Sequence, residues 1–307
     1  MKFIYHLWIA HASMKFLNLL FFYGILIPLS YLPYPVLYFI SDGLYVVIYK
    51  LVGYRKKVVL QNITNSFPHK TSEEHLQIVK AFYRHLCDLV VESIKGFSIS
   101  EAEVKQRMKV INPEYIDRFF DQGQSVILAG GHYNNWELFA VAIDAPIKHK
   151  AVALYKPLSN KFFDEKMRSS RSKYGLEMIS TKASREEFEK TDCLRVIILG
   201  VDQFPGRSTN CYWSTFLNQD TAMIFGAEKY AKEYNYPVLY GRINKVKRGY
   251  YSFEFSDAIE EPQMTGYGEI TKAINHLIEK DIIAKPEYWL WSHKRWKHKR
   301  PVDYVHE

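Results

Sequence analysis

Short apolar runs alternate with amphipathic segments along most of the chain. Runs such as SVILAG and LRVIILGVD are typical of buried strands, whereas the segments between them have apolar residues at helical spacing. This alternation predicts a single layered α/β fold, in which ligands bind at the carboxyl ends of the strands. The predicted strands are 125–130, 150–155, 194–202, 237–244 and 249–259, and the predicted helices are 72–97, 160–175, 184–191, 223–235 and 267–296.

The first fifty residues have a different, almost uniformly apolar pattern. Residues 16–41 carry no charge, and the most apolar part, 16–32, would span roughly 25 Å as a helix, slightly less than a bilayer core of about 30 Å. Pro28, Pro33 and Pro35 predict that this helix breaks near the membrane interface.

A second apolar stretch, 36–52, contains Asp42 and Lys50, so we expect it to lie on the membrane or to pack on the globular body. A buried helical hairpin is an alternative interpretation of the whole segment. A cleaved signal peptide is another, although the run is long for one and no A-x-A site follows. The predicted division is a membrane anchor with interfacial helices in residues 1–53 and a globular domain in 54–307.

Charges on either side of the apolar segment predict its orientation. Cations after it outnumber those before it, which favours a body on the cytoplasmic side of the membrane. The cations after it are Lys50, Arg55, Lys56 and Lys57, against Lys2 and Lys15 before it.

Composition narrows the choice of partners. The net charge of +8 favours an anionic partner, such as a phospholipid surface, a phosphorylated substrate, an acidic protein or nucleic acid. The 3 cysteines are widely spaced and form no C-x-x-C pattern, so we expect neither a zinc site nor a disulfide framework.

The stretch GGHYNNWE, residues 130–137, carries the candidate chemistry. A histidine is the usual general base near neutral pH, and a carboxylate on its other ring nitrogen fixes the tautomer. His132 and Glu137 meet if the histidine lies in the Gly130–Gly131 turn and the glutamate in the first turn of a helix. The spacing alone is a weak signal, because it also describes a polar turn.

Other polar residues follow predicted strands or lie in basic segments. Tyr155 and Asp202 end predicted strands, as His132 does, although Asp202 has the alternative role of a turn or capping residue. Arg168 and Arg171 either line a site or form a solvated helix face. The closing HKRWKHKRP binds phosphates, nucleic acid or lipid headgroups, or merely solvates the chain end.

Taken together, these stretches resemble the bacterial lipid A late acyltransferases, the lauroyl/myristoyl transferase branch of the lysophospholipid acyltransferase-like superfamily. The resemblance spans nearly the whole chain. It is carried by the N-terminal anchor, RKKVVLQNITNSFP, GGHYNNWE, YKPLSNKFFDEKMRSSRSKYG, VDQF and PEYWLWSHKRWKHKRP, in that order.

The resemblance implies an enzyme of the bacterial inner membrane, facing the cytoplasm, that moves a fatty acyl chain from acyl carrier protein or acyl-CoA to a lipid hydroxyl. It implies no metal or redox cofactor and no nucleic-acid partner, and it implies an anionic glycolipid or phospholipid acceptor. His132 would be the general base and Glu137 its orienting partner, with Arg171 and Asp202 completing the catalytic set. The implied substrate contacts are Gly131, Asn134, Tyr155, Lys156, Arg168, Arg295 and Lys297.

Two departures leave the acceptor open. Phe204 stands where the family has a second acid after Asp202, and YWSTFLNQDTAM lacks the family's Phe-Phe-Gly. A lipid A precursor is the first expectation, and an amino-acid-based or other lyso-lipid is an alternative. Rival functions are a catalytically silent lipid-binding protein, a thioester hydrolase and a nucleic-acid-binding module.

Overall fold

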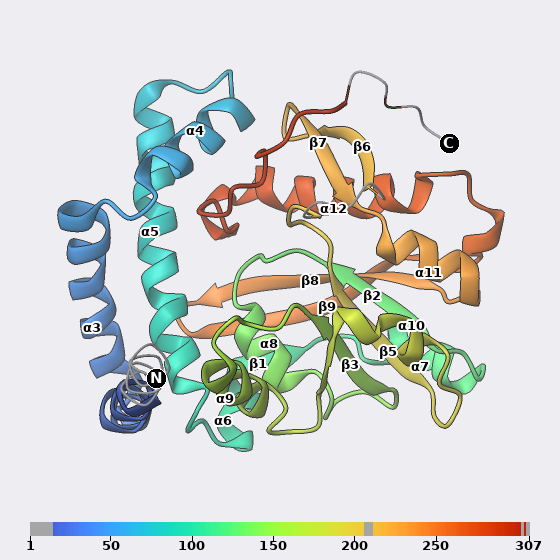
Figure 1. The fold of residues 1–307 in the computed structure, drawn as a ribbon, viewed down its shortest axis with the longest axis horizontal. Helices are drawn as coiled ribbons and strands as arrows, with labels where there is room; N and C mark the ends of the chain where they lie inside the picture. Colours follow the sequence, from blue (N-terminus) through green and yellow to red (C-terminus); the bar gives the residue numbers. More distant parts are fainter. Residues whose placement is uncertain (1–14, 206–210, 302–303, 305–307) are drawn as a thin grey trace, which may run out of the picture.

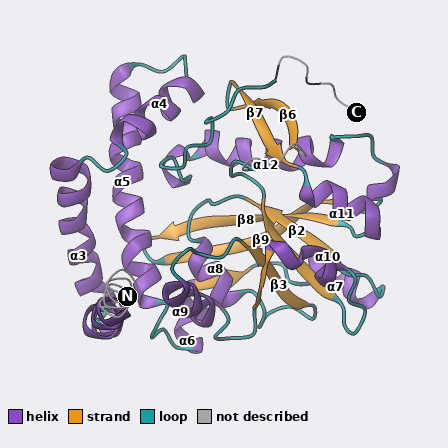
Figure 2. Ribbon diagram, in the orientation of Figure 1, coloured by secondary structure: helices purple, strands orange, loops and turns teal. Residues whose placement is uncertain are grey.

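A computed structural model describes residues 15–205, 211–301 and 304, and it has the layered α/β architecture that the sequence predicts (Figure 2). The strands of its main sheet are β1 (Met108–Val110), β2 (Val126–Gly130), β3 (Lys150–Tyr155), β4 (Glu177–Ser180), β5 (Arg195–Gly200), β8 (Val238–Lys247) and β9 (Tyr250–Ile259).

The strand order in this sheet is β1-β9-β8-β2-β5-β3-β4. Strands β8, β2, β5, β3 and β4 run parallel, whereas β9 is antiparallel to β8, and β1 is parallel to β9. The carboxyl ends of β2, β5 and β3 therefore lie at one edge, where the sequence analysis expects ligands.

Helices cover both faces of the sheet. As Figure 1 is drawn, α11 and α12 lie above the strands, whereas α6, α8 and α9 lie below them. A long helix, α5, stands at the end of the β8–β9 hairpin. The helices of the body are α4 (Lys56–Ser66), α5 (Ser72–Lys95), α6 (Glu101–Arg107), α7 (Glu114–Asp121), α8 (Trp136–Ala142), α9 (Lys161–Arg171), α10 (Ser184–Phe188), α11 (Gly226–Tyr234) and α12 (Glu269–Ala284).

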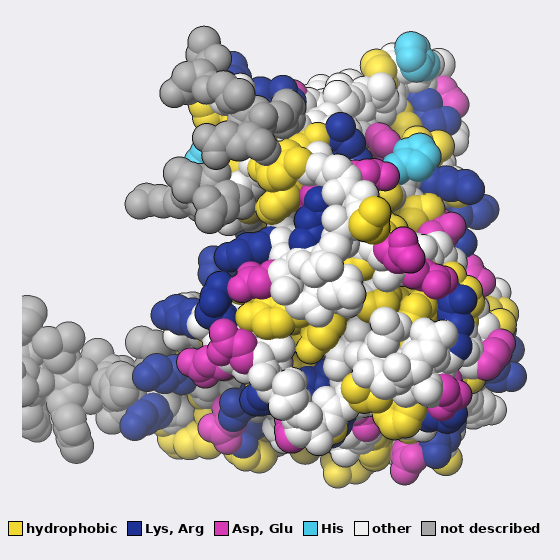
Figure 3. All heavy atoms as spheres, turned by 90° about the vertical axis from the view of Figure 1, so that its right-hand side faces the viewer, with side chains coloured by type: hydrophobic (Ala, Val, Ile, Leu, Met, Phe, Trp, Pro, Cys, Tyr) yellow, Lys and Arg dark blue, Asp and Glu magenta, His cyan; other side chains and the backbone are white. Residues whose placement is uncertain are grey.

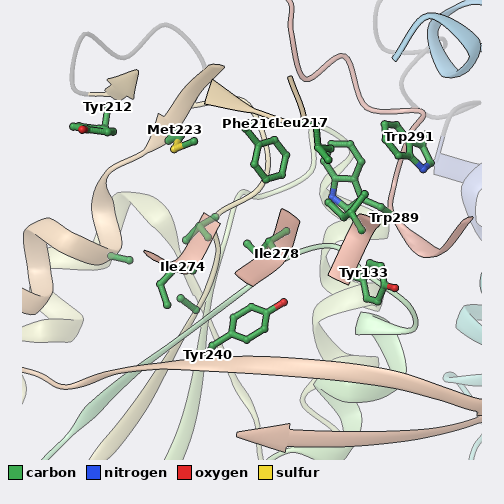
Figure 4. Close-up of a cluster of buried hydrophobic side chains, with 14 of the residues drawn as sticks. Tyr133, Tyr212, Phe216, Leu217, Met223, Tyr240, Ile274, Ile278, Trp289 and Trp291 are labelled. Carbon is green, nitrogen blue, oxygen red and sulfur yellow. The ribbon is translucent and has the colours of Figure 1, made fainter. Parts of the chain in front are cut away.

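The central strand β2 is buried on both of its faces. Ile127 and Ala129 join the core under α11 and α12, and Val126 and Leu128 join the core on the α6–α8 side. Alternating side chains point to opposite faces of a sheet, so a strand covered on both sides reads as one continuous apolar run. Figure 4 shows the first core, with Ile278 of α12 between the sheet and the aromatic side chains above it.

The N-terminal apolar segment forms two helices. The first runs over Lys15–Tyr31 and includes a π-helical stretch, η1 (Phe22–Leu26), followed by α2 (Ile27–Tyr31). Pro28 was expected to break this helix and does not. It occupies the start of α2, directly after the π-helical turns, where its missing N–H is tolerated. The chain turns at Pro33 as predicted.

The second N-terminal helix comprises α3 (Tyr34–Tyr45) and the π-helical η2 (Val46–Val52). Within the described part of the chain, this 19-residue helix is the one long and apolar enough to cross a membrane, and only 17% of its most apolar window is buried. The sequence pattern instead favours the preceding stretch, residues 16–32, as the membrane-spanning segment. Residues 1–14, including Lys2, lie outside the described range.

Helix α3 lies along α5, and the two are side by side in Figure 1. Its polar side faces α5, where the Ser41 hydroxyl donates to Asp88 at 2.8 Å. Its outer side is apolar and exposed, with 79% of Phe39 accessible.

Two predicted elements are wrong. Residues 223–224 were assigned to a helix, but they end β7 (Gln219–Ile224), which pairs antiparallel with β6 (Cys211–Phe216) in a separate hairpin. The final predicted helix, 267–296, stops at Ala284. Pro286 follows within two residues, and proline cannot continue the hydrogen-bond pattern of a helix.

Surface charge is mixed on the face opposite the N-terminal helices. Figure 3 shows lysine and arginine side chains interspersed there with aspartate and glutamate, and they do not merge into one basic patch. The net charge of +8 therefore does not mark this face as the anion-binding one.

Two isoleucines of α12 provide a matched test of how this helix packs on the central strand β2. Ile278 is 1% exposed, whereas Ile283, five positions later, is 58% exposed. We expect Ile278→Ala to lower the free energy of unfolding by about 2–5 kcal/mol, because it leaves a cavity in the core. Ile283→Ala should change it by less than about 0.5 kcal/mol. Urea unfolding of the purified variants measures both, and equal values would contradict this packing.

Candidate active site

His132 and Asp202 are brought together by the pairing of two neighbouring strands. In the parallel β2–β5 pair, Gly130 lies opposite Gly200, and each candidate residue follows two positions later. The Val201 amide also donates to the Gly130 carbonyl at 3.0 Å, which continues the pairing past the end of β5. The two side chains thus emerge side by side, although they are 70 positions apart in the sequence.

Asp202 is the partner of His132. The ring nitrogen Nδ1 of His132 donates to Oδ1 of Asp202 at 2.7 Å, and the His132 backbone amide donates to Oδ2 at 2.8 Å. A third donor, Nε1 of Trp289, reaches Oδ2 at 2.7 Å. The carboxylate is 1% exposed, and these three N–H groups supply the hydrogen bonds that a buried charge needs.

The two pKa values of this pair shift in opposite directions. Burial raises the pKa of Asp202, but the charge of His132 and the hydrogen bonds from His132 and Trp289 outweigh burial and lower it to about 2. Burial lowers the pKa of His132, but the charge of Asp202, its hydrogen bond and the charge of Glu137 together raise it above 6.5. Asp202 therefore stays ionised and fixes the tautomer in which Nε2 of His132 is the basic nitrogen.

Two glycines leave room for this arrangement. A side chain at Gly200 would place its Cβ 2.9 Å from Cε1 of His132, and one at Gly131 would place its Cβ 3.3 Å from Oδ2 of Asp202. The first distance is shorter than Cβ contacts in proteins allow, so the imidazole would have to move. Gly131, predicted as a substrate contact, therefore lies directly against the His132–Asp202 pair.

Glu137 does not contact His132 through a hydrogen bond among the described contacts, so its predicted role as the orienting partner is wrong. It lies in the first turn of α8 and accepts two hydrogen bonds from Arg171 of α9, from Nε at 2.8 Å and from Nη2 at 2.7 Å. Nε1 of Trp136 also donates to Glu137 at 3.0 Å. The Trp136 ring lies edge-on to the His132 ring, with the two centroids 5.4 Å apart. The described side chains at this edge of the sheet therefore include two charged pairs, His132–Asp202 and Glu137–Arg171.

The two pairs differ in exposure. The side chain of Asp202 is 1% exposed and that of Glu137 16%, whereas His132 and Arg171 are 29% and 24% exposed. Burial lowers the pKa of Arg171, but the charge of Glu137 and its hydrogen bonds outweigh burial and raise it, so the guanidinium keeps its charge. A substrate at this edge of the sheet can reach His132 and the Glu137–Arg171 pair, but not Asp202.

Three other predicted contacts lie on or beside α9. Tyr155 ends β3, and its hydroxyl donates to Asp164 at 3.1 Å. Arg168 is exposed and lines an open hollow together with Ser169 and Ser172. Lys156 is exposed directly after β3. The structure therefore leaves the cations of Arg168 and Lys156 free to meet solvent or an anionic group.

Two predicted substrate contacts are contradicted by burial. Asn134 is 1% exposed, and its amide donates to the carbonyl of Ile243 at 2.7 Å. Arg295 is 1% exposed, and its Nη1 donates to the carbonyl of Ala222 at 2.6 Å. The Asn134 side chain thus points to β8 of the main sheet and that of Arg295 to β7 of the separate hairpin, whereas Lys297 is exposed.

Two residues that contribute to the site were missed in the sequence. Trp289 lies in the terminal motif and was not predicted to contribute to the site, although its indole donates the third hydrogen bond to Asp202. Asn135 caps α8, because its side-chain oxygen accepts from the Leu138 amide at 2.8 Å. The signal for Asn135 was available, since asparagine before a predicted helix is a favoured N-cap.

Comparisons with known proteins identify the family of this chain. Residues 9–298 match the family model described as bacterial lipid A biosynthesis acyltransferase. The chain is 23% identical over 275 residues to the lipid A biosynthesis palmitoleoyltransferase of Escherichia coli K12, with 88% of each chain covered. It is 22% identical over 277 residues to the lipid A biosynthesis lauroyltransferase of the same organism, with 89% of each covered.

A relative from Haemophilus influenzae, named lipid A biosynthesis acyltransferase, is 23% identical over 270 residues, covering 87% of this chain and 86% of its own. The family match extends from the N-terminal segment, through both charged pairs, to the terminal tryptophan-rich motif. The chain is therefore an acyltransferase, and it belongs to the bacterial lipid A biosynthesis acyltransferase family.

Proposed function

We propose that this protein transfers a fatty acyl chain from acyl carrier protein or acyl-CoA to a hydroxyl of a lipid A precursor or a similar lipid, with His132 as the general base. The observation that carries the proposal is the Asp202–His132 hydrogen bond of 2.7 Å, which leaves Nε2 of a partly exposed histidine as the basic atom. The names of the relatives support the acceptor class.

The proposed reaction is one acyl transfer. Nε2 of His132 takes the proton of the lipid hydroxyl as that oxygen attacks the thioester carbonyl and forms the new C–O bond. The tetrahedral intermediate collapses, the C–S bond breaks, and the leaving thiolate receives the proton from His132. The buried charge of Asp202 stabilises the imidazolium during the interval between these two proton transfers.

The Glu137–Arg171 pair has a different proposed role. Glu137 engages Nε and one N–H of Nη2 of Arg171, so the two N–H groups of Nη1 and the second N–H of Nη2 remain as donors for the carbonyl oxygen or for the developing oxyanion. Glu137 holds the guanidinium in one orientation and, through its charge, contributes to the raised pKa of His132. In this proposal the His132–Asp202 pair transfers the proton, and the Glu137–Arg171 pair stabilises the developing negative charge.

The N-terminal helices are proposed to hold the enzyme on the inner membrane with the body facing the cytoplasm. The exposed apolar side chains of Lys15–Tyr31 and of α3 support this placement, and so does the basic segment that begins at Arg55. In this arrangement residues 1–53 form the anchor, and 54–307 the catalytic domain.

Charged and aromatic side chains support the choice of donor and acceptor. Lys156, Arg168 and Lys297 are exposed cations that suit an anionic headgroup or the acidic surface of a carrier protein. Phe204 stacks on His298 with ring centroids 4.5 Å apart, so this departure from the family pattern makes an aromatic contact instead of an acidic one. The part of the acceptor that lies near Phe204 can therefore differ from that of the named relatives.

Lipid mass spectrometry of cells with and without the gene tests the function. We expect one acyl chain to be missing from a defined lipid without the gene, and to be restored by wild type but not by His132→Ala. Restoration by His132→Ala would contradict the general-base role. An unchanged lipid profile with the protein expressed would contradict the transferase function itself.

Asp202→Asn tests the orientation of the imidazole. An amide at this position can donate to Nδ1, which shifts the proton to Nε2 and removes the basic atom. We expect kcat to fall by about 10²–10⁴-fold with little change in KM. The control is Asp121→Asn, which removes an exposed surface charge paired with Lys148 and should alter kcat by less than about twofold. Similar kcat values for both variants would exclude Asp202 from the mechanism.

The pH profile tests the link between the two pairs. Because the neutral imidazole is the active form, kcat/KM should fall as the pH drops through the pKa of His132, with a midpoint above 6.5. Glu137→Gln removes a negative charge and leaves Arg171 unbalanced, and both effects lower that pKa. We expect the midpoint to move to lower pH and the plateau to fall by about tenfold or more. A midpoint that stays in place would mean that Glu137 does not act on His132 through its charge.

A further inference from the structure

Glu92 of α5 is a buried carboxylate with three hydrogen-bond donors. It is 7% exposed. Its Oε1 accepts from the hydroxyl of Tyr38 at 2.9 Å, and its Oε2 accepts from Nδ2 of Asn135 at 2.5 Å and from the hydroxyl of Tyr251 at 2.9 Å. These donors come from α3, from the start of α8 and from β9, so one side chain joins three elements that are distant in the sequence.

The contact with Asn135 leads directly to the active site. Nδ2 of this amide is held by Glu92, which turns Oδ1 toward the Leu138 amide at 2.8 Å and caps α8. The first turn of α8 carries Glu137, and Glu137 holds Arg171. The orientation of the Asn135 side chain therefore determines the position of the first turn of α8, and with it the position of the Glu137 carboxylate.

The contact with Tyr38 leads to the apolar N-terminal helices. Tyr38 lies on α3, whose opposite side exposes Val36 and Phe39 by 41% and 79%. An apolar helix face of this kind is suited to a lipid surface. Two side chains, Glu92 and Asn135, thus connect α3, which would contact lipid, to α8, which carries Glu137.

The other half of the charged pair has its own link to the N-terminal helices. Phe22 of η1 packs edge-on against Phe162 and Phe163 of α9, with ring centroids 5.6 and 6.4 Å apart. Helix α9 ends with Arg171. The N-terminal apolar segment is therefore connected to both members of the Glu137–Arg171 pair, to Arg171 through direct packing on α9 and to Glu137 through Glu92 and Asn135.

We propose that Glu92 is a positioning residue that transmits the docking of α3 to the Glu137–Arg171 pair, so that turnover depends on how α3 is seated. This inference rests on the proposed acyl transfer. A loss of the Tyr38–Glu92 contact leaves Oε1 without this donor and the carboxylate held through Oε2 alone, by Asn135 and Tyr251. The less constrained carboxylate loosens the Asn135 cap and lets Glu137 and Arg171 leave the orientation that serves the reaction.

Tyrosine-to-phenylalanine substitutions on α3 provide a matched test. Tyr38→Phe removes the hydroxyl that binds Glu92. Tyr34→Phe removes a hydroxyl from the preceding turn, where the ring stacks on the guanidinium of Arg107 and makes no hydrogen bond to Glu92 among the described contacts. We expect Tyr38→Phe to lower kcat about fivefold with KM within about twofold, and Tyr34→Phe to change kcat by less than about 1.5-fold.

A double-mutant cycle tests whether the effect passes through the cap. Asn135→Ser keeps a capping oxygen but removes the donor to Glu92. In that background, Tyr38→Phe should change kcat by less than about 1.5-fold, because the link is already cut. If Tyr38→Phe and Asn135→Ser lower kcat independently, so that the double variant shows the product of their two fold-changes, the proposal is overturned. Equal effects of Tyr38→Phe and Tyr34→Phe would also overturn it.

Hydrogen exchange at the start of α8 separates this inference from the proposed function. In the purified full-length protein, the amides of 136–142 should exchange about fivefold faster in Tyr38→Phe than in Tyr34→Phe or wild type. If wild type transfers no acyl group to lipid, the proposed function fails, and exchange alone decides whether the link exists. If wild type does transfer, and Tyr38→Phe alters neither exchange nor kcat, the positioning role of Glu92 is refuted.

Discussion

The hydrogen bond between His132 and Asp202 depends on the parallel register of β2 and β5, and the rest of the site is arranged around it. Because Gly130 lies opposite Gly200, both strands end at the same level and deliver their next side chains to one point. A buried carboxylate without partners would cost several kcal/mol, so the three N–H donors to Asp202 are a condition of the fold. The absent side chain at Gly200 leaves the space that the imidazole ring occupies.

The two charged pairs differ in burial, and this difference explains how His132 and the Arg171 guanidinium can lie at one edge of the sheet without sharing a carboxylate. If Arg171 contacted Asp202 directly, it would compete with His132 for the same carboxylate oxygens. Glu137 instead neutralises Arg171 at the partly exposed edge, whereas Asp202 is left to the imidazole in the interior. The cation is then close enough to stabilise charge on a substrate and sufficiently balanced to leave the pKa of His132 raised.

The sequence was sufficient to predict five strands of the main sheet, β2, β3, β5, β8 and β9, and to place His132 at one edge of that sheet, because these follow from periodicity and strand ends. The short strands β1 and β4 were not predicted. The sequence was not sufficient to identify the partner of His132. Glu137 is five positions away in the sequence, but the Asn135 cap starts α8 in a direction that turns its carboxylate toward α9. Strand register, which no local pattern encodes, brings Asp202 instead. The β6–β7 hairpin was missed for a related reason, since its turn uses Leu217 and Asn218 with positive φ, where glycine is the usual signal.

In the terminal motif, aromatic packing buries a cation that the basic sequence would place on the surface. A run of cations mixed with tryptophan suggests a solvated clamp for anions, but Trp289 and Trp291 are buried and draw Arg295 into the interior with them. Burial lowers the pKa of Arg295 to about 10, and the charge of Asp202 acts against that shift. By the same Coulomb interaction, the guanidinium favours the ionised form of Asp202 without touching it. The buried part of the motif, Trp289 to Arg295, therefore contributes to the electrostatic environment behind His132, whereas Lys297 is exposed to solvent.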